Sequence, residues 1–276
     1  MIYHVITLFP DLIRTAMETS VIGRAMEKGL ISLDTIQLRD YAGNRYGAVD
    51  DYTYGGGAGL LIRCEPVFLA YREAMSRAGF GFPEEDDKKS IQSYRSLGQP
   101  VLADTPNSDE GNFCQNISSA DRPPRVIFTS PGGKTFTEET ARELSHEEQL
   151  IFICGHYEGV DERVLEEIVT DDYSIGDYVL TGGELPVIVM MDAISRLIPG
   201  ALHNEESAET DSFENGLIEY PQFTRPQNWR GKEVPEILLS GDHAKVNKWR
   251  FHESLLRTKA QRPELYRKWL HDRGIY

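Results

Sequence analysis

The sequence predicts an α/β protein in which a main domain on a parallel sheet is followed by a small helical domain. Three runs of β-favouring residues, 125–129, 150–154 and 175–180, each lead into a turn with glycine or proline. A helix-like segment follows each run. Because the carboxyl ends of parallel strands lie at one edge of a sheet, we expect the three turns to converge on one ligand crevice.

Length and composition are typical of a reduced intracellular protein. The 276 residues can bury a large core, and no apolar run approaches the roughly 18–20 residues that span a bilayer. The first ten residues lack the basic leader and cleavage site of a signal peptide. Cys64, Cys114 and Cys154 are an odd number without CxxC spacing. We therefore expect a cytoplasmic protein with no membrane contact and no structural zinc.

Charge is distributed unevenly along the chain. The net charge of −15 argues against a polyanionic partner such as nucleic acid. Residues 222–276, however, hold 12 Lys and Arg against 6 Asp and Glu, a net of +6, which leaves 17 against 38, or −21, for residues 1–221. The basic segment can contact phosphate, but its cations can equally serve only to solvate helix surfaces.

The N-terminal part begins with a strand at residues 3–8, a helix from Pro10 and a second strand at 31–38. Residues 49–60 follow, with four glycines in the five positions 55–59, which excludes a helix or strand interior and predicts a loop. The loop lacks the Gly-Lys-Ser/Thr ending of a phosphate-binding Walker A loop. Its pattern alone favours a structural turn over a binding site.

The middle of the chain changes character between residues 79 and 124. Its charged run and its polar residues show little periodicity, which predicts a mobile surface insertion that could act as a lid. Beyond it, Thr137 should cap a helix, with Glu138 and Glu139 favourably placed near the positive end. Another helix should follow Val160.

The stretch from Ser174 to Pro186 combines a β-favouring run with a glycine turn and a helix start. Gly182 and Gly183 allow close approach of a ligand, and Pro186 suits the first turn of a helix. That helix should cover residues 185–197 and end near Arg196. A helix C-terminus favours a cation there even without a catalytic role.

The C-terminal part begins with a polar, acidic segment, residues 203–216, that reads as a hinge. Two helices, one from about Asp242 and one from Pro263, should form a small basic domain. Its three tryptophans are expected in the core rather than as platforms for stacking bases: Trp229, Trp249 and Trp269.

Many separated motifs, in order, resemble one family: the bacterial tRNA (guanine-N1-)-methyltransferases, the TrmD family of the SPOUT superfamily. The resemblance covers almost everything outside residues 79–124 and departs from the family's usual proline at Ala58. It rests on residues 8–10 (Leu-Phe-Pro), 49–51 (Val-Asp-Asp), 54–57 (Tyr-Gly-Gly-Gly), 155–163 (Gly-His-Tyr-Glu-Gly-Val-Asp-Glu-Arg), 174–186, 196–200 (Arg-Leu-Ile-Pro-Gly), 211–213 (Asp-Ser-Phe), 220–226 (Tyr-Pro-Gln-Phe-Thr-Arg-Pro), 234–235 (Val-Pro), 238–241 (Leu-Leu-Ser-Gly) and 262–265 (Arg-Pro-Glu-Leu).

The resemblance implies a catalytic domain at residues 1–201 tied in a deep trefoil knot, which general topology rules would exclude. A flexible linker at 202–219 and a helical tRNA-binding domain at 220–276 would follow. The family forms homodimers with the active site between subunits. It transfers a methyl group from S-adenosylmethionine to N1 of the guanosine immediately 3′ of the anticodon, giving 1-methylguanosine. The partner would thus be the anticodon arm of tRNA.

The resemblance also implies site residues. Asp211 would be the general base, Arg196 would stabilise negative charge on guanine O6, and Glu158 would contact guanine or a magnesium ion. Asp177 would add to the acidic surroundings of the cationic cofactor, or else simply cap a turn. The cofactor would be held by Ser130, Pro131, Gly155, Tyr157, Ile175, Gly176, Asp177, Tyr178, Val179, Leu180, Gly182 and Gly183.

Other interpretations stay open from the sequence. Without the resemblance, Asp211 is one carboxylate among several in an acidic hinge, where most are solvated charges. A protein that binds RNA without catalysis would carry the same basic C-terminal segment. An enzyme that binds nucleotide phosphates through Gly55–Gly59 is a weaker alternative, because no phosphate-binding lysine follows.

Overall fold

The computed structural model describes residues 1–81, 122–202, 212–213 and 215–275, so most of the predicted insertion and the hinge residue Asp211 lie outside the described residues. The chain forms two compact units, Met1–His203 and Asn204–Tyr276, which are treated separately below. None of the helices in the described ranges has the length and apolar character needed to cross a membrane.

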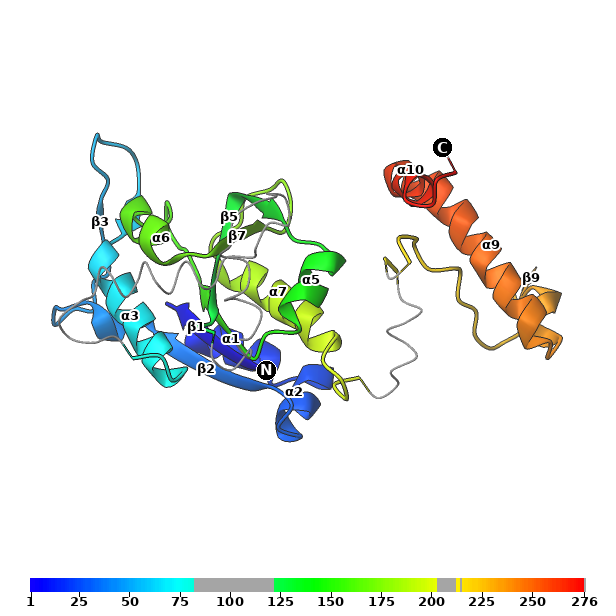
Figure 1. Cartoon of the computed structure of the whole chain (residues 1–276), viewed down its shortest axis with the longest axis horizontal. Coiled ribbons are helices and arrows are strands. Elements are labelled where there is room, and N and C mark those ends of the chain that lie inside the picture. Colours follow the sequence, from blue (N-terminus) through cyan, green and yellow to red (C-terminus); the bar gives the residue numbers. More distant parts are fainter. Residues whose placement is uncertain (82–121, 203–211, 214, 276) are drawn as a thin grey trace, which may run out of the picture. The chain divides into compact units, whose positions relative to one another are not determined.

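The first unit is organised on one parallel sheet of five strands (Figure 1). Their order across the sheet is β2-β1-β6-β5-β7, and each neighbouring pair runs parallel. The strands are β1 (Ile2–Thr7), β2 (Ser32–Gln37), β5 (Arg125–Thr135), β6 (Gln149–Ile153) and β7 (Asp171–Ser174). The α/β class and the parallel sheet expected from the sequence are confirmed.

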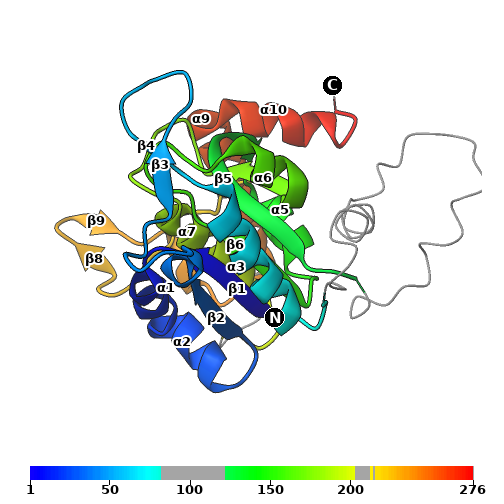
Figure 2. The same ribbon diagram turned by 90° about the vertical axis from the view of Figure 1, so that its left-hand side faces the viewer.

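Helices cover both faces of this sheet. On one face lie α1 (Pro10–Met17), α2 (Ser20–Glu27), α5 (Glu138–Leu144) and α7 (Glu184–Arg196); on the other lie η1 (Leu38–Tyr41), α3 (Cys64–Arg77) and α6 (Glu162–Ile168). Figure 2 shows the same arrangement from the side.

Side chains that alternate in direction along each strand form two hydrophobic cores, one on each face of the sheet. In β1, Tyr3 and Val5 point to the α7 face, whereas Ile6 points to the α3 face. In β6, Phe152 and Ile151 divide in the same way. A sheet buried on both faces explains why these strands read as continuous apolar runs.

The predicted helix starts at Pro10, Thr137 and after Val160 are confirmed, and the side-chain oxygen of Thr137 accepts a hydrogen bond from the backbone N–H of Thr140 as a helix cap. Asp161 caps α6 in the same manner by accepting from the N–H of Arg163. The sequence reading had no helix at Cys64–Arg77.

Two strand predictions need correction. The β-favouring run at 175–180 is not a strand: β7 ends at Ser174, and Val179 is 84% exposed in the loop that follows. Nor does β5 end at Thr129; it continues to Thr135, and its pairing with β7 shifts register between Thr129 and Lys134. The β propensity of single residues does not show whether a neighbouring strand is there to pair with. Residues 175–180 have no such neighbour among the described strands, whereas Lys134 and Thr135 pair with β7.

The glycine-rich segment at 49–60 lies within a small hairpin of β3 (Asp50–Tyr52) and β4 (Leu60–Ile62). The loop between the two strands agrees with the prediction, but β3 was not expected. The base of the hairpin binds the segment after β6, because the N–H of Glu158 donates to Leu60 O (3.0 Å) and the N–H of Ile62 donates to Gly159 O (3.0 Å). The tip extends away from the sheet (Figures 1 and 2).

The second unit contains a short hairpin, β8 (Asn228–Trp229) and β9 (Lys232–Glu233), then η4 (Glu236–Leu239), α9 (His243–Gln261) and α10 (Pro263–His271). The helix starts expected near Asp242 and at Pro263 are confirmed. Trp269 packs with Leu217 and Leu270 in a small core, as expected. Trp229 contradicts the expectation, because it is 55% exposed on the hairpin.

A buried ion pair joins the sheet strands β5 and β7. The Nε of Arg125 donates to Asp171 Oδ2 (2.9 Å), and Arg125 also bonds Glu143. Burial disfavours the Asp171 carboxylate, but hydrogen bonds from Arg125 and Thr170 outweigh that effect and hold the pKa of Asp171 below its ordinary value. The pair should therefore stabilise the fold wherever Asp171 is ionised.

Asp171→Asn should lower the free energy of unfolding by about 1.5–3 kcal/mol at pH 7, the usual range for a hydrogen bond to a charged group. A depressed pKa stabilises the folded state above the unfolded-state pKa of about 3.9 and loses that contribution as the pH falls through the folded-state value. The difference between the two proteins should hence shrink below about pH 4. Urea unfolding at several pH values measures it, and a difference independent of pH would contradict this explanation.

Candidate functional site

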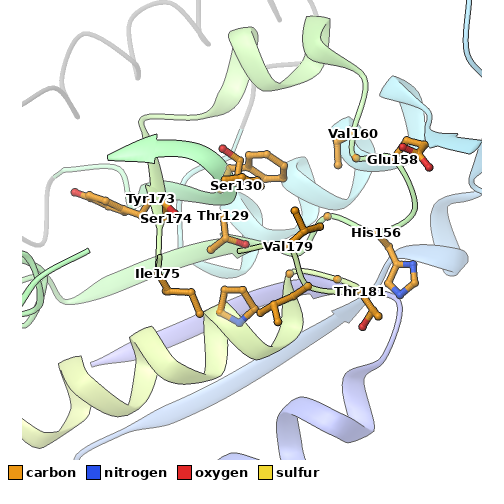
Figure 3. A pocket seen from close by; sticks show the side chains of 18 of the residues that line it. Thr129, Ser130, His156, Glu158, Val160, Tyr173, Ser174, Ile175, Val179 and Thr181 are labelled. Carbon is orange, nitrogen blue, oxygen red and sulfur yellow. The ribbon is translucent and has the colours of Figure 1, made fainter. Parts of the chain in front are cut away.

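A cavity of about 350 Å³ opens at the carboxyl edge of the sheet, beside the ends of β5, β6 and β7. Its walls come from residues 129–131 at the irregularity in β5, from the loop at residues 155–160, and from the end of β7 with the loop that follows it, residues 173–183. Pro186 at the start of α7 completes this set. Figure 3 shows side chains from these loops, among them Thr129, His156 and Val179, around one space. The convergence predicted for the three turns is confirmed, and the volume suits a small-molecule ligand.

Backbone contacts hold two of these loops together. The N–H of Gly183 donates to Gly155 O at 2.7 Å, and His156 forms an isolated antiparallel bridge with Gly182. The chain after the edge strand β7 therefore passes the end of β5 and reaches the loop after β6 before it enters α7.

Glycine is required where these loops touch. A Cβ on Gly183 would lie 2.8 Å from the backbone nitrogen of Gly155 and 2.9 Å from Cys154 Cα, both closer than real side chains come. At Gly176, φ is +147°, a conformation that other residues rarely adopt. The glycines thus let backbone approach backbone, which leaves peptide groups to line the cavity.

Two buried polar atoms at the cavity have no hydrogen-bond partner among the described residues: Thr129 Oγ1 and His156 Nδ1. The His156 ring is held between Phe9 and Tyr157, with ring centroids 5.3 and 4.9 Å away. Buried polar groups are normally paired, so both atoms are suited to bind a ligand that carries its own donors and acceptors.

Carboxylates lie around the same edge. Ser130 Oγ donates to Asp172 Oδ2 at 2.7 Å, and buried Glu184 accepts a 2.8 Å hydrogen bond from Thr7 Oγ1 below the loops. Burial, reinforced by the nearby Glu184 carboxylate, raises the pKa of the Cys154 thiol well above its ordinary value. Cys154 is therefore a protonated core residue and not a nucleophile.

The structure brings 11 of the 12 predicted cofactor residues to the cavity wall; Asp177 alone is exposed away from it. Glu158 also lines the cavity, and its carboxylate lies so close to Gly59 that a Cβ there would be 2.4 Å from Oε1. Arg196 is exposed in the last turn of α7 and does not line the cavity. Asp211 lies outside the described residues.

Sequence reading missed several residues of the wall. His156 and Glu162 stand inside the motif that was recognised, so their position between Gly155 and Arg163 was a usable signal. Thr129 carried no such signal, because its place in the wall depends on the close approach of Gly183. A Cβ added to Gly183 would lie 3.0 Å from Thr129 Oγ1. Phe128, Gly159, Val160, Leu165, Tyr173, Ser174, Thr181 and Pro186 complete the wall.

Fold and cavity together define a class: an α/β protein that binds a small molecule in glycine-rich loops at the carboxyl edge of a parallel sheet. The chain also matches the family model described as "tRNA (Guanine-1)-methyltransferase TrmD" over residues 1–96 and 110–268. Residues 97–109, inside the predicted insertion, stay outside that match.

Whole-length relatives give the same result. The tRNA (guanine-N(1)-)-methyltransferase of Lachnoclostridium phytofermentans is 48% identical, covering 95% of this chain and 90% of its own. Those of Lachnospira eligens and Clostridioides difficile are 45% and 41% identical and cover at least 96% of both chains. The chain belongs to the tRNA (guanine-1)-methyltransferase family, and it is an enzyme that methylates N1 of guanine in tRNA.

Proposed function

We propose that the enzyme uses S-adenosylmethionine, bound in the cavity between the three loops, to methylate the guanosine immediately 3′ of the anticodon. The observation that carries this proposal is the cavity itself: its loops contain the stretches at 155–163 and 174–186 by which the chain resembles its family. When bound, the cofactor supplies an activated methyl group on a cationic sulfur.

The residues of the wall would hold the cofactor mainly through backbone groups of the glycine loops. Thr129 Oγ1 and His156 Nδ1, which lack partners among the described residues, would pair with its polar groups. The apolar side chains of Ile175, Val179 and Leu180 line the same space and would exclude water from the bound adenosine.

Guanine N1 carries a proton and is a poor nucleophile at neutral pH, so the transfer needs a general base. In the proposal the Asp211 carboxylate takes that proton as N1 forms its bond to the methyl carbon, and the electron pair of the broken carbon–sulfur bond remains on sulfur. Arg196 offsets the negative charge that develops on guanine O6. Glu158, which lines the cavity, would contact guanine or a magnesium ion.

Arg196 does not line the cavity, so the proposal includes a second subunit that completes the site. Exposed apolar side chains on α1 and α7 support such a homodimer: Leu12 is 45%, Leu185 49% and Val189 50% exposed on neighbouring helices. Burying them against a second copy would be favourable. The passage of the chain after β7 across the end of β5 supports the trefoil knot of the family's fold.

Methyl transfer from radiolabelled S-adenosylmethionine to an unmodified transcript with guanosine 3′ of the anticodon tests the proposal. We expect labelled 1-methylguanosine, and none from a matched transcript with adenosine at that position. Label in another nucleotide would contradict the target assignment. We also infer action in the cytoplasm, where the thiols Cys64 and Cys154, both free in the structure, would stay reduced.

The same protein sample separates the alternatives. A protein that only binds RNA would show no thermal stabilisation by S-adenosylmethionine, whereas we expect a clear rise in melting temperature. A phosphate-binding role for Gly55–Gly59 predicts competition by ATP. That loop is exposed and lies outside the cavity wall, so we expect none.

A further inference from the structure

A second cavity, of about 520 Å³, lies within the C-terminal unit and is separate from the cofactor cavity. One side is the extended segment 220–227, and the other is formed by Val246, Trp249 and Arg250 of α9 with Leu238 and Leu239 of η4. Helix α9 is capped at its start, where Asp242 Oδ1 accepts from the N–H of Lys245 (3.1 Å). The cavity is therefore built by ordered elements of one unit.

The aromatic rings of Tyr220, Phe223 and Trp249 line this cavity. Phe223 and Trp249 contact each other with ring centroids 6.3 Å apart and planes tilted by 49°, so the two rings are not stacked in parallel. The Arg250 guanidinium lies over the Tyr220 ring at 4.9 Å. Phe223 is 46% exposed and Leu239 is 52% exposed, which leaves apolar surface open to solvent at the cavity. Exposed apolar surface of this kind is typical of a binding site.

Charge and hydrogen-bonding groups identify the ligand. Among the described residues that line the cavity, the charged ones are Arg225 and Arg250, and none is acidic. Arg250 Nε is buried and has no hydrogen-bond partner among the described residues. Gln222, Thr224 and Gln227 add amide and hydroxyl groups that can pair with a base edge. Aromatic faces, cations and amides together are how proteins bind unstacked nucleotides of RNA.

We propose that this cavity holds one unpaired, unstacked nucleotide of the tRNA substrate. Its base lies against Trp249 and Phe223, Arg250 covers it as a cation over the ring system, and Arg225 at the exposed edge contacts the neighbouring phosphate. Residues 222–276 carry a net charge of +6, which attracts a polyanion more strongly than a protein surface with few acidic residues. The inference rests on tRNA methylation as the function and adds a positioning site within the C-terminal unit.

Steady-state methylation and direct tRNA binding by the full-length enzyme test it. Trp249→Ala and Phe223→Ala should each raise the KM and Kd for tRNA by about five-fold to a hundred-fold, the range for loss of one stacked base. The kcat at saturating tRNA and the affinity for S-adenosylmethionine should stay unchanged. Trp249→Phe, which keeps an aromatic face, should recover most of the affinity.

Salt dependence separates the two kinds of contact. Arg225→Ala should reduce the slope of log Kd against log salt by about one phosphate contact, whereas Trp249→Ala should leave the slope unchanged. Trp229→Ala is the matched control, because Trp229 lies in the same unit, exposed and outside the cavity. It should leave tRNA binding unchanged.

The outcomes are distinguishable. If wild type methylates tRNA and both Phe223→Ala and Trp249→Ala, with unchanged melting temperature, bind tRNA as wild type does, the inference is wrong and the function stands. If the variants instead alter subunit association in sedimentation without changing the KM for tRNA, the cavity is a protein contact and the inference is equally wrong. Absence of methylation by wild type would overturn the proposed function itself.

Discussion

Asp211→Ala should lower the turnover of N1 methylation by about 10²- to 10⁴-fold, the usual contribution of a positioned general base. The affinity for S-adenosylmethionine should be unchanged, because the described residues that line the cavity lie between Phe128 and Pro186. Without a base, only the small fraction of guanine that has already lost its N1 proton can react. Single-turnover methylation with saturating tRNA measures the loss directly, separately from product release.

Two controls define this result. Glu209→Ala removes a neighbouring carboxylate of the same acidic segment and should retain wild-type turnover; a loss as large as that of Asp211→Ala would mean that the charge of the segment matters and not one base. In the Asp211→Ala enzyme, residual activity should rise with pH as solvent takes over removal of the proton. A flat profile would assign Asp211 a different role.

Mixing the Asp211→Ala and Arg196→Ala proteins tests whether the site spans two subunits. After exchange of subunits, a mixed dimer would contain one site with both residues intact if they come from different chains. Activity above that of either variant alone supports a shared site. If every functional residue came from one chain, the mixture would stay inactive.

Gly183→Ala should abolish measurable binding of S-adenosylmethionine and lower the free energy of unfolding by about 1–3 kcal/mol, the usual cost of forcing extra volume into packed structure. The added Cβ would meet the backbone of Gly155 and Cys154 at 2.8–2.9 Å, so one loop would have to move away from the other. The hydrogen bond from Gly183 N–H to Gly155 O, 2.7 Å, would lengthen with it. Isothermal titration and denaturant unfolding measure the two effects.

Gly81→Ala is the matched control, because a Cβ at that position meets no atom of the described residues within 4 Å and its φ is not positive. It should bind the cofactor and unfold as wild type does. If Gly183→Ala also retained cofactor binding, the close contact between the two loops would not be what shapes the cavity.

Local signals in the sequence predicted much of the fold correctly. Apolar runs at 150–154 and 3–8 became central strands because both faces of the sheet are covered by helices. Thr137 and Pro10 marked helix starts through chemistry that acts within four residues. Such features depend on near neighbours in the chain, so residue type alone carries them.

Predictions from the sequence were wrong where contacts with distant segments of the chain decide the structure. The apolar run at 175–180 looked like a strand but forms a cavity loop, since Val179 and Leu180 face the ligand space and have no neighbouring strand to pair with. Trp229 looked like a core residue yet stands exposed on a two-residue strand that offers nothing to cover it.

By itself the sequence determined the class of fold, several of its strands and helix starts, the family, and the three glycine-bearing turns that form the site. Only the tertiary structure decided that Thr129, His156 and Glu158 share one wall with those turns, and that a second, aromatic cavity exists between segment 220–227 and α9. The physical reason is the range of the forces involved. Capping and periodicity act along the chain, whereas a cavity is the space left when segments far apart in sequence pack against one another.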